Sequence, residues 1–117
     1  MSLVLKIKRV YERPESGDGT RILVDRLWPR GLTKERAGVN FWLKEVAPST
    51  RLRKWFGHDP KKWKHFRSRY RAELKKYSDE LATIRAKAKK GRVTLLYGAR
   101  DQRHNEAIVL KEFVEGV

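Results

Sequence analysis

The chain has 117 residues, a length that fits one domain built around one hydrophobic core. It carries 29 Lys and Arg against 14 Asp and Glu, a formal net charge of +15, yet 39% of its residues are hydrophobic, which excludes a disordered basic tail. The absence of Cys excludes disulfides, thiolate nucleophiles, cysteine zinc sites and iron–sulfur clusters.

The first predicted elements are two strands. In residues 4–10, Leu5 and Ile7 alternate with Lys6 and Lys8, and this alternation predicts a short strand. After a turn-rich loop over 13–20, residues 22–28 predict a second strand, whose apolar start indicates burial on both faces. The loop is short enough for a hairpin, so the sequence leaves open whether these strands run parallel.

Two short helices are predicted from their end signals. Thr33 is a predicted N-cap for a helix over 34–37, which Gly38 ends. Ser49 is the predicted cap of another helix, which Gly57 ends. The apolar segment between these helices has no assignment from the sequence.

Longer helices and a buried strand fill the second half of the chain. Asp59-Pro60 is a strong start signal, and apolar residues then recur at steps of three or four as far as Gly91, with a predicted break at Ser78-Asp79. Residues 93–97 predict a buried strand, and 98–101 lead into a last helix. Its expected inward-facing residues are Ala107, Leu110, Val114 and Val117.

Apolar strands separated by helical stretches are typical of an α/β protein. We therefore expect a single domain over 1–117, with a small, partly parallel β-sheet flanked by helices. No apolar run approaches the roughly 20 residues that span a bilayer, and no signal-peptide core is present. The sequence thus predicts a cytoplasmic protein without membrane association.

The positive charge is concentrated in residues 51–92, which hold 16 Lys and Arg against four Asp and Glu. Such a helical face is suited to a nucleic-acid backbone, but a solvated surface is the favoured interpretation, because basic stripes are common. The residues expected to contact nucleic acid in the first case are Lys61, Lys62, Lys64, Arg67, Arg71 and Lys75.

The segment after the second strand is the first candidate site, because ligands bind beyond the carboxyl ends of parallel strands. Arg26 and Arg30 are bidentate donors suited to a phosphate or carboxylate, and Trp28 stiffens the turn between them. Asp25 ends an apolar run and needs a partner. The alternative is a structural Asp–Arg pair with Trp28 in the core.

The segment after the strand at 93–97 is the second candidate site. Arg100 and Asn105 lie near the expected start of the last helix, whose free N–H groups favour an anion. Asp101 is a predicted helix cap, and His104 is a possible proton donor or acceptor. The glycines of a Walker loop or a dinucleotide fingerprint are absent.

His58 belongs to a third polar cluster, next to the predicted cap Asp59. It is either a surface turn residue or a side chain that reaches a cleft. The chain has three His, and none has a second ligand at metal-binding spacing on one helix, so no metal site and no cofactor are expected.

Several strings occur in an order and spacing that resemble one family across nearly the whole chain. They are KRVY (8–11), VDRLWPRG (24–31), APS (47–49), WFGHDP (55–60), and VTLLY (93–97) through AIVL (107–110). This resembles the YeaO-like branch of the family called domain of unknown function 488, which implies a small bacterial or archaeal α/β protein with no established activity. The broader family usually shows Cys-His-Arg at the start of its last helix. The matching stretch here reads His104-Asn105-Glu106, which excludes a thiol or cysteine-phosphatase-like mechanism.

The leading hypothesis is binding of an anionic small molecule, a nucleotide or a phosphorylated metabolite. Arg26, Trp28 and Arg30 are expected to meet Arg100 and Asn105 around it. The alternative is a nucleic-acid-associated protein without catalysis.

Hydrolase or transferase chemistry stays open. If it occurs, His104 or His58 transfers protons, and Asp25 or Asp101 orients the imidazole.

Overall fold

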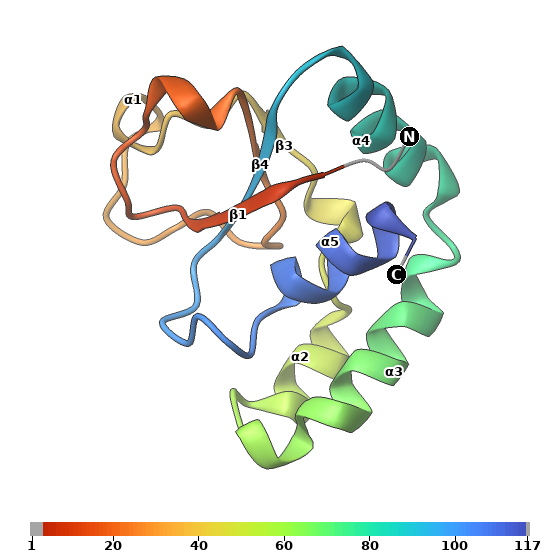
Figure 1. Cartoon of the computed structure of the whole chain (residues 1–117). Helices are drawn as coiled ribbons and strands as arrows, with labels where there is room; N and C mark the ends of the chain where they lie inside the picture. The colour runs from red at the N-terminus through yellow and green to blue at the C-terminus, as the bar shows by residue number, and fades with distance from the viewer. Residues whose placement is uncertain (1–3, 117) are drawn as a thin grey trace.

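The computed structural model describes residues 4–116, and in it helices cover a four-stranded parallel sheet (Figure 1). In chain order its strands and helices are β1 (Lys6–Arg9), β2 (Thr20–Leu23), α1 (Lys34–Ala37), β3 (Phe41–Trp42), α2 (Thr50–Phe56), α3 (Trp63–Leu74), α4 (Ser78–Lys90), β4 (Val93–Tyr97) and α5 (Glu106–Glu115). Short 3-10 turns lie at Ser16–Asp18, Lys44–Val46 and Pro60–Lys62. The predicted α/β class is confirmed.

β4 is an inner strand of the sheet, whose order is β1-β4-β2-β3 with every neighbouring pair parallel. All five residues of β4 are buried, which explains why 93–97 is an unbroken apolar and β-branched run. β1 and β2 each pair with β4 and not with each other. The hairpin alternative is therefore wrong.

The predicted strand over 22–28 is wrong at its carboxyl end, because β2 stops at Leu23. Beyond Val24 the chain leaves the ladder and turns. The Nε1 of Trp28 donates to the carbonyl of Leu32 at 2.7 Å, which closes this turn through a side chain. Trp28 therefore packs against the smaller core from a loop, whereas Leu27 is exposed.

Both short helices begin and end where the capping signals place them. The Thr33 hydroxyl accepts a hydrogen bond from the amide of Arg36, and Gly38 adopts a left-handed conformation at φ 58°. The Ser49 hydroxyl accepts from the amide of Leu52 in the same way. The unassigned segment between these helices forms β3, a two-residue strand at the sheet edge.

α5 begins later than expected. Its N-cap is Asn105, whose Oδ1 accepts from the amide of Ile108 at 3.2 Å. Asp101 instead caps the preceding turn, since its Oδ1 accepts from the amide of Arg103 at 2.8 Å. The prediction of Asp101 as the helix cap is therefore wrong, and Val117 lies outside the described residues.

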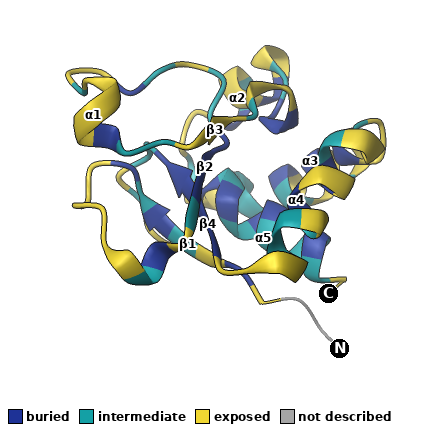
Figure 2. Cartoon of the chain, turned by 90° about the horizontal axis from the view of Figure 1, so that it is seen from above, coloured by how far each residue is buried: buried dark blue, intermediate teal, exposed yellow. Residues whose placement is uncertain are grey.

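The two faces of the sheet have different covers. α2, α3, α4 and α5 pack on one face, and α1 with its flanking loops packs on the other (Figures 1 and 2). Leu95 belongs to the large core under the four helices, and the next residue, Leu96, belongs to the smaller core on the α1 side. In the large core the fully buried Tyr70 donates its hydroxyl hydrogen to the carbonyl of Val46.

An ion cluster lies on the α1 side, near the start of β2. The carboxylate of Asp18 is fully buried and accepts from Lys8 Nζ at 3.0 Å and from Arg21 Nη1 at 2.6 Å. Lys8 Nζ also donates to the exposed Glu15 at 2.8 Å. We call Lys8, Glu15, Asp18 and Arg21 the Asp18 cluster. It ties β1 and β2 to the turn that precedes β2.

Candidate functional site

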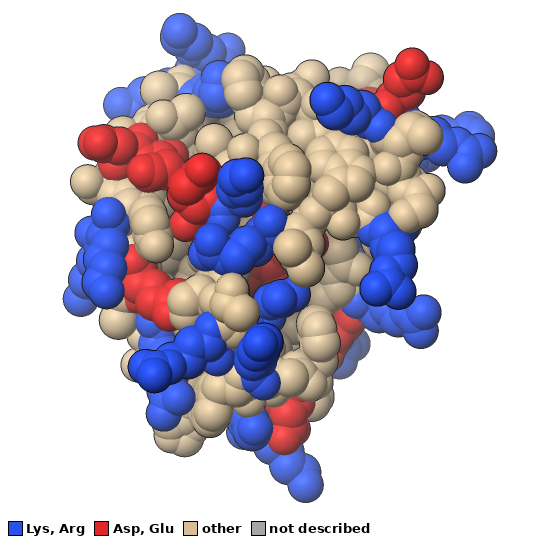
Figure 3. All heavy atoms as spheres, turned by 180° about the vertical axis from the view of Figure 1, so that it is seen from behind, with Lys and Arg blue, Asp and Glu red and all other residues tan. Residues whose placement is uncertain are grey.

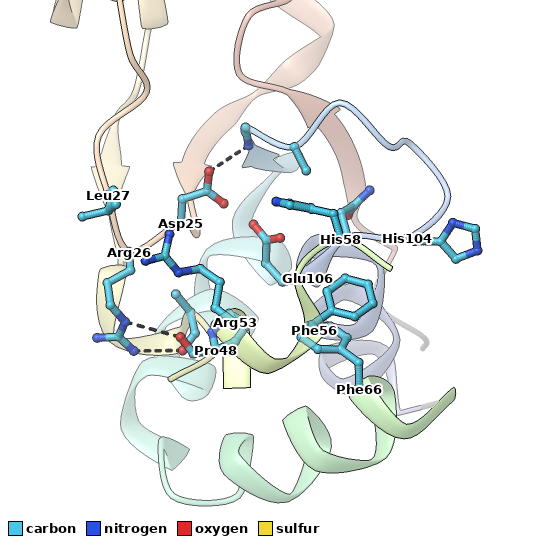
Figure 4. A pocket seen from close by; sticks show the side chains of 14 residues that line it. Asp25, Arg26, Leu27, Pro48, Arg53, Phe56, His58, Phe66, His104 and Glu106 are labelled. Atoms are coloured by element: carbon cyan, nitrogen blue, oxygen red, sulfur yellow. Dashed lines mark hydrogen bonds between the residues drawn. The ribbon is translucent and has the colours of Figure 1, made fainter. Parts of the chain in front are cut away.

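A pocket of about 250 Å³ opens beyond the carboxyl ends of β2 and β4 (Figure 4). This is the edge of the sheet where the strand-end argument places ligands. Its walls come from the segment after β2, the α2–α3 region and the segment from β4 to α5. The lining residues are Asp25, Arg26, Leu27, Ala47, Pro48, Arg53, Phe56, His58, Phe66, Gly98, Ala99, His104, Asn105 and Glu106.

Asp25 is held at the pocket by the backbone of the neighbouring strand end. Its Oδ2 accepts from the amide of Gly98 at 2.8 Å, and a Cβ at position 98 would lie 2.8 Å from the same oxygen. Glycine therefore allows this approach. Arg26 does not supply the expected partner, because its guanidinium donates to the carbonyls of Ala47 at 3.1 Å and Pro48 at 3.3 Å.

Glu106, the first residue of α5, forms a carboxyl pair with Asp25 (Figure 4). Burial raises the pKa of Glu106 well above its ordinary value, and the charge of Asp25 and the hydrogen bond between the two carboxyls raise this pKa further. Burial and the neighbouring Asp25 therefore both favour the uncharged form of the Glu106 carboxyl. Glu106 is not recognisable from the sequence as a site residue, because a glutamate in the first turn of a helix is typically solvated and interacts favourably with the helix dipole.

Replacing Glu106 with Gln is expected to reduce the loss of folding stability that the unsubstituted protein shows as the pH rises. The folded state raises the pKa of this carboxyl, so its contribution is fully present below the ordinary value near 4.5 and is lost as the pH rises towards the raised pKa. Thermal unfolding between pH 5 and pH 9 measures this, with Glu35→Gln as a control in the exposed first turn of α1. Parallel profiles for the unsubstituted protein and Glu106→Gln would contradict the raised pKa of Glu106.

Arg53 is a second pocket residue that the sequence analysis missed. It lies on α2, and its guanidinium extends towards the carboxyl pair (Figure 4). Its positive charge opposes the rise in the pKa of Glu106, which agrees with this proximity. Within residues 4–116 its guanidinium makes no hydrogen bond, unlike that of Arg26. In the sequence it is one of many basic residues on a helix, and only the fold distinguishes it.

Both predicted histidines line the pocket. His104 is held by Asp101, whose Oδ2 lies 2.9 Å from its Nδ1, and its ring meets the Trp63 ring edge-on at 5.3 Å. The ring of His104 is turned away from the carboxyl pair in Figure 4. His58 has a left-handed backbone at φ 58° and packs near Phe56, with ring centroids 6.3 Å apart.

Of the other predicted ligand-binding residues, only Asn105 lines the pocket with Arg26. Trp28 packs in the smaller core and meets Trp42 at 5.5 Å, as the structural alternative expects. Arg30 is exposed, with its carbonyl bonded to a tyrosine hydroxyl, and Arg100 is exposed ahead of α5. Neither Trp28, Arg30, Arg100 nor Asp101 is part of the pocket wall, because the chain turns before position 28 and α5 starts at 106.

The six basic residues expected to contact nucleic acid do not form one free surface. Lys62 Nζ donates to the carbonyl of Trp55 at 2.8 Å, and Arg67 pairs with Glu112 at 2.9 Å. Arg71 lies over an aromatic ring of α5 at 5.3 Å. The other three are exposed: Lys61, Lys64 and Lys75. Figure 3 shows basic side chains spread over one face of the molecule with acidic groups among them.

Two further features bear on the class of protein. Within residues 4–116, no group of three or more His, Asp or Glu side chains is arranged to hold a metal ion. In the same part of the chain, no helix has the length and apolar character needed to cross a membrane.

Comparison with known proteins places the whole chain in one family. A family model described as the inactive DUF488-N3 subclade matches residues 4–117. The uncharacterized protein YeaO of Escherichia coli (strain K12) is 42% identical over 113 residues, which cover 97% of this chain and 98% of the relative. An uncharacterized protein of Mycobacterium tuberculosis (strain ATCC 25618 / H37Rv) is 39% identical over 112 residues, which cover 96% of this chain and 94% of the relative.

A similar relative occurs in Mycobacterium bovis, an uncharacterized protein that is also 39% identical over 112 residues, with 96% of this chain and 94% of the relative covered. No solved structure matches the chain significantly. On the family model and these full-length relatives, the chain belongs to the domain of unknown function 488 family, in its YeaO-like branch.

Proposed function

We propose that this chain binds a small phosphorylated molecule, a nucleotide or a phosphorylated metabolite, in the pocket beyond β2 and β4. The observation that carries the proposal is the guanidinium of Arg53, which enters the pocket and makes no hydrogen bond within the described chain. An arginine fork matches the oxygens of a phosphate. The proposed role is binding without turnover, in agreement with the family's description as inactive and with the absence of Cys.

The charge balance of the pocket supports an anionic ligand. The guanidinium groups of Arg26 and Arg53 both line the pocket, and the raised pKa of Glu106 favours the uncharged form of that carboxyl. The chain as a whole carries +15, so its field attracts anions over longer distances. Both effects weaken as salt screens the charges.

The apolar part of the wall supports an organic ligand over a bare inorganic ion. Phe56 and Phe66 line the pocket, and their rings stack with centroids 4.3 Å apart. Apolar walls with a few polar groups are typical of small-molecule sites. A volume of about 250 Å³ fits a compact ligand such as a sugar phosphate or a mononucleotide moiety.

Removing the arginine is expected to remove most of the affinity. Titration calorimetry with ribose 5-phosphate and adenosine monophosphate should detect binding, and Arg53→Ala should weaken it roughly tenfold to a hundredfold, the loss of a charge-assisted hydrogen bond of about 1.5–3 kcal/mol. Arg51→Ala is the matched control, because Arg51 is exposed on the same helix and lies outside this pocket.

The uncharged counterparts ribose and adenosine should bind much more weakly. Absence of any Arg53-dependent binding of the phosphorylated probes would overturn the proposed function. Release of inorganic phosphate from either probe by the purified protein would contradict the part of the proposal that excludes turnover.

A further inference from the structure

We infer that the ligand of this pocket is a phosphorylated sugar compound whose hydroxyl groups are bound by Asp25 and Glu106. This inference rests on the proposed function, and it adds the chemical class of the second half of the ligand. The carboxyl pair and Arg53 line one small pocket, so a single compact molecule contacts both.

One buried oxygen of the carboxyl pair has no hydrogen-bond donor. Within the described chain the Gly98 amide donates to Asp25, the backbone of Glu106 donates to its own carboxyl, and a hydrogen bond joins the two carboxyls. Glu106 Oε1 is buried and has no hydrogen-bond partner in the described protein. Buried polar groups in folded proteins are nearly always paired. A ligand that brings hydrogen-bond donors therefore completes this site.

A hydroxyl group fits the pair better than a charged group does. A second anion beside the pair is repelled by the charge of Asp25, and an ammonium group is repelled by Arg53. A hydroxyl carries no charge and both donates and accepts, so it can bond either the protonated or the ionised carboxyl. Paired hydroxyls of a sugar are the groups that acidic side chains bind in nucleotide sites of other folds.

An aromatic wall beside the carboxyl pair also fits a sugar. The stacked rings of Phe56 and Phe66 line the pocket together with Glu106, as Figure 4 shows. The carbon-bound hydrogens of a sugar ring present an apolar surface to such a wall, while its hydroxyls stay free for hydrogen bonds. A phosphorylated sugar thus matches the guanidinium, the carboxyl pair and the apolar wall at once.

Two probes that share a phosphate group but differ in their hydroxyl groups measure how much the sugar contributes to affinity. Ribose 5-phosphate and n-pentyl phosphate are titrated into the full chain by calorimetry under identical conditions. Because only ribose 5-phosphate brings hydroxyls to the pair, we expect it to bind at least about tenfold more tightly. This comparison in the unsubstituted protein does not depend on any variant folding.

Substitutions at Glu106 then test whether this residue causes the difference in affinity between the two probes. Glu106→Leu removes the polar group and should abolish the preference for ribose 5-phosphate, while binding of n-pentyl phosphate stays within about twofold. Glu106→Gln keeps a neutral donor and acceptor and should retain most of the preference. Melting curves of both variants establish that they are folded before titration.

The outcomes distinguish this inference from the proposed function. Equal affinity for the two phosphates, with both lost in Arg53→Ala, would overturn the sugar inference and leave phosphate binding intact. If neither phosphorylated probe bound the unsubstituted protein, both the sugar inference and the proposed function would be overturned. A preference for ribose 5-phosphate that survives in Glu106→Leu would also overturn the inference, because the hydroxyls would then be bound elsewhere.

Discussion

Asp18→Ala is expected to destabilise the protein by about 3–5 kcal/mol, because it breaks a buried ion pair and leaves its cations without their partner. Asp18 is fully buried and bonds both Lys8 and Arg21, whose side chains are almost fully buried themselves. Lys8 keeps only the exposed Glu15 and the carbonyl of Arg13 in the variant, and Arg21 keeps two backbone carbonyls. Urea unfolding followed by circular dichroism measures the loss.

Glu15→Ala is the matched control for this substitution. Glu15 contacts the same Lys8 Nζ at 2.8 Å, but its side chain is 71% exposed. A solvent-exposed partner of this kind contributes about 1 kcal/mol or less. A loss in Asp18→Ala no larger than that in Glu15→Ala would show that the Asp18 cluster does not hold the fold together.

The Asp18 cluster also makes the folding stability of the protein fall at acid pH. Burial alone raises the pKa of Asp18, but hydrogen bonds from the Glu15 amide, Lys8 and Arg21 outweigh it and lower this pKa to about 2. Because the folded state lowers the pKa, this stabilisation is fully present above the ordinary value near 3.8 and is lost as the pH falls through about 2. The Asp18→Ala variant should not show this loss of stability at low pH.

Gly19→Ala is expected to destabilise the protein by more than about 3 kcal/mol, since strain in a glycine-only backbone region adds to a direct clash. Gly19 has φ 65° and ψ −135°, and a Cβ there would lie 2.2 Å from the carbonyl oxygen of Arg92. That oxygen accepts from the amide of Thr20 at 2.9 Å, at the start of the β2–β4 ladder. Backbone on both sides leaves no flexible group to move.

Gly17→Ala is the matched control two residues earlier. A Cβ at position 17 would meet only the end of the flexible Arg92 side chain, at 3.6 Å. Its expected effect is within about 0.5 kcal/mol, as for most surface substitutions. Soluble yield and thermal melting compare the two variants, and a Gly19→Ala protein that melts within a few degrees of Gly17→Ala would refute the expected clash.

Much of the fold could be predicted because its signals are local. The strand at 93–97 is recognisable from its unbroken apolar run, and Thr33 and Ser49 are helix caps whose hydroxyls act on residues three positions away. The end of β2 was misplaced, because Leu27 and Trp28 were counted as strand residues, whereas Leu27 is exposed and Trp28 packs in the smaller core outside the ladder. The start of α5 was misplaced because Asp101 and Asn105 are both good caps, and the sequence does not say which one the helix uses.

The location of the candidate site could be predicted from the sequence, but several of its residues could not. Strand-end topology placed Asp25 and His104 in one pocket from opposite ends of the chain. Arg53 and Glu106 escaped notice because their side chains are ordinary on helices, where most charges are solvated. Both residues lie beside Asp25 in the folded protein although they are far from it in the sequence, and no local sequence pattern predicts that proximity.

The Asp18 cluster and the pocket have no residue in common. The cluster lies on the α1 side of the sheet, whereas Phe56 and Phe66 of the pocket wall belong to the large core on the other face. Arg53→Ala therefore leaves every ion pair of the Asp18 cluster in place, so a change in affinity in this variant can be separated from a change in stability.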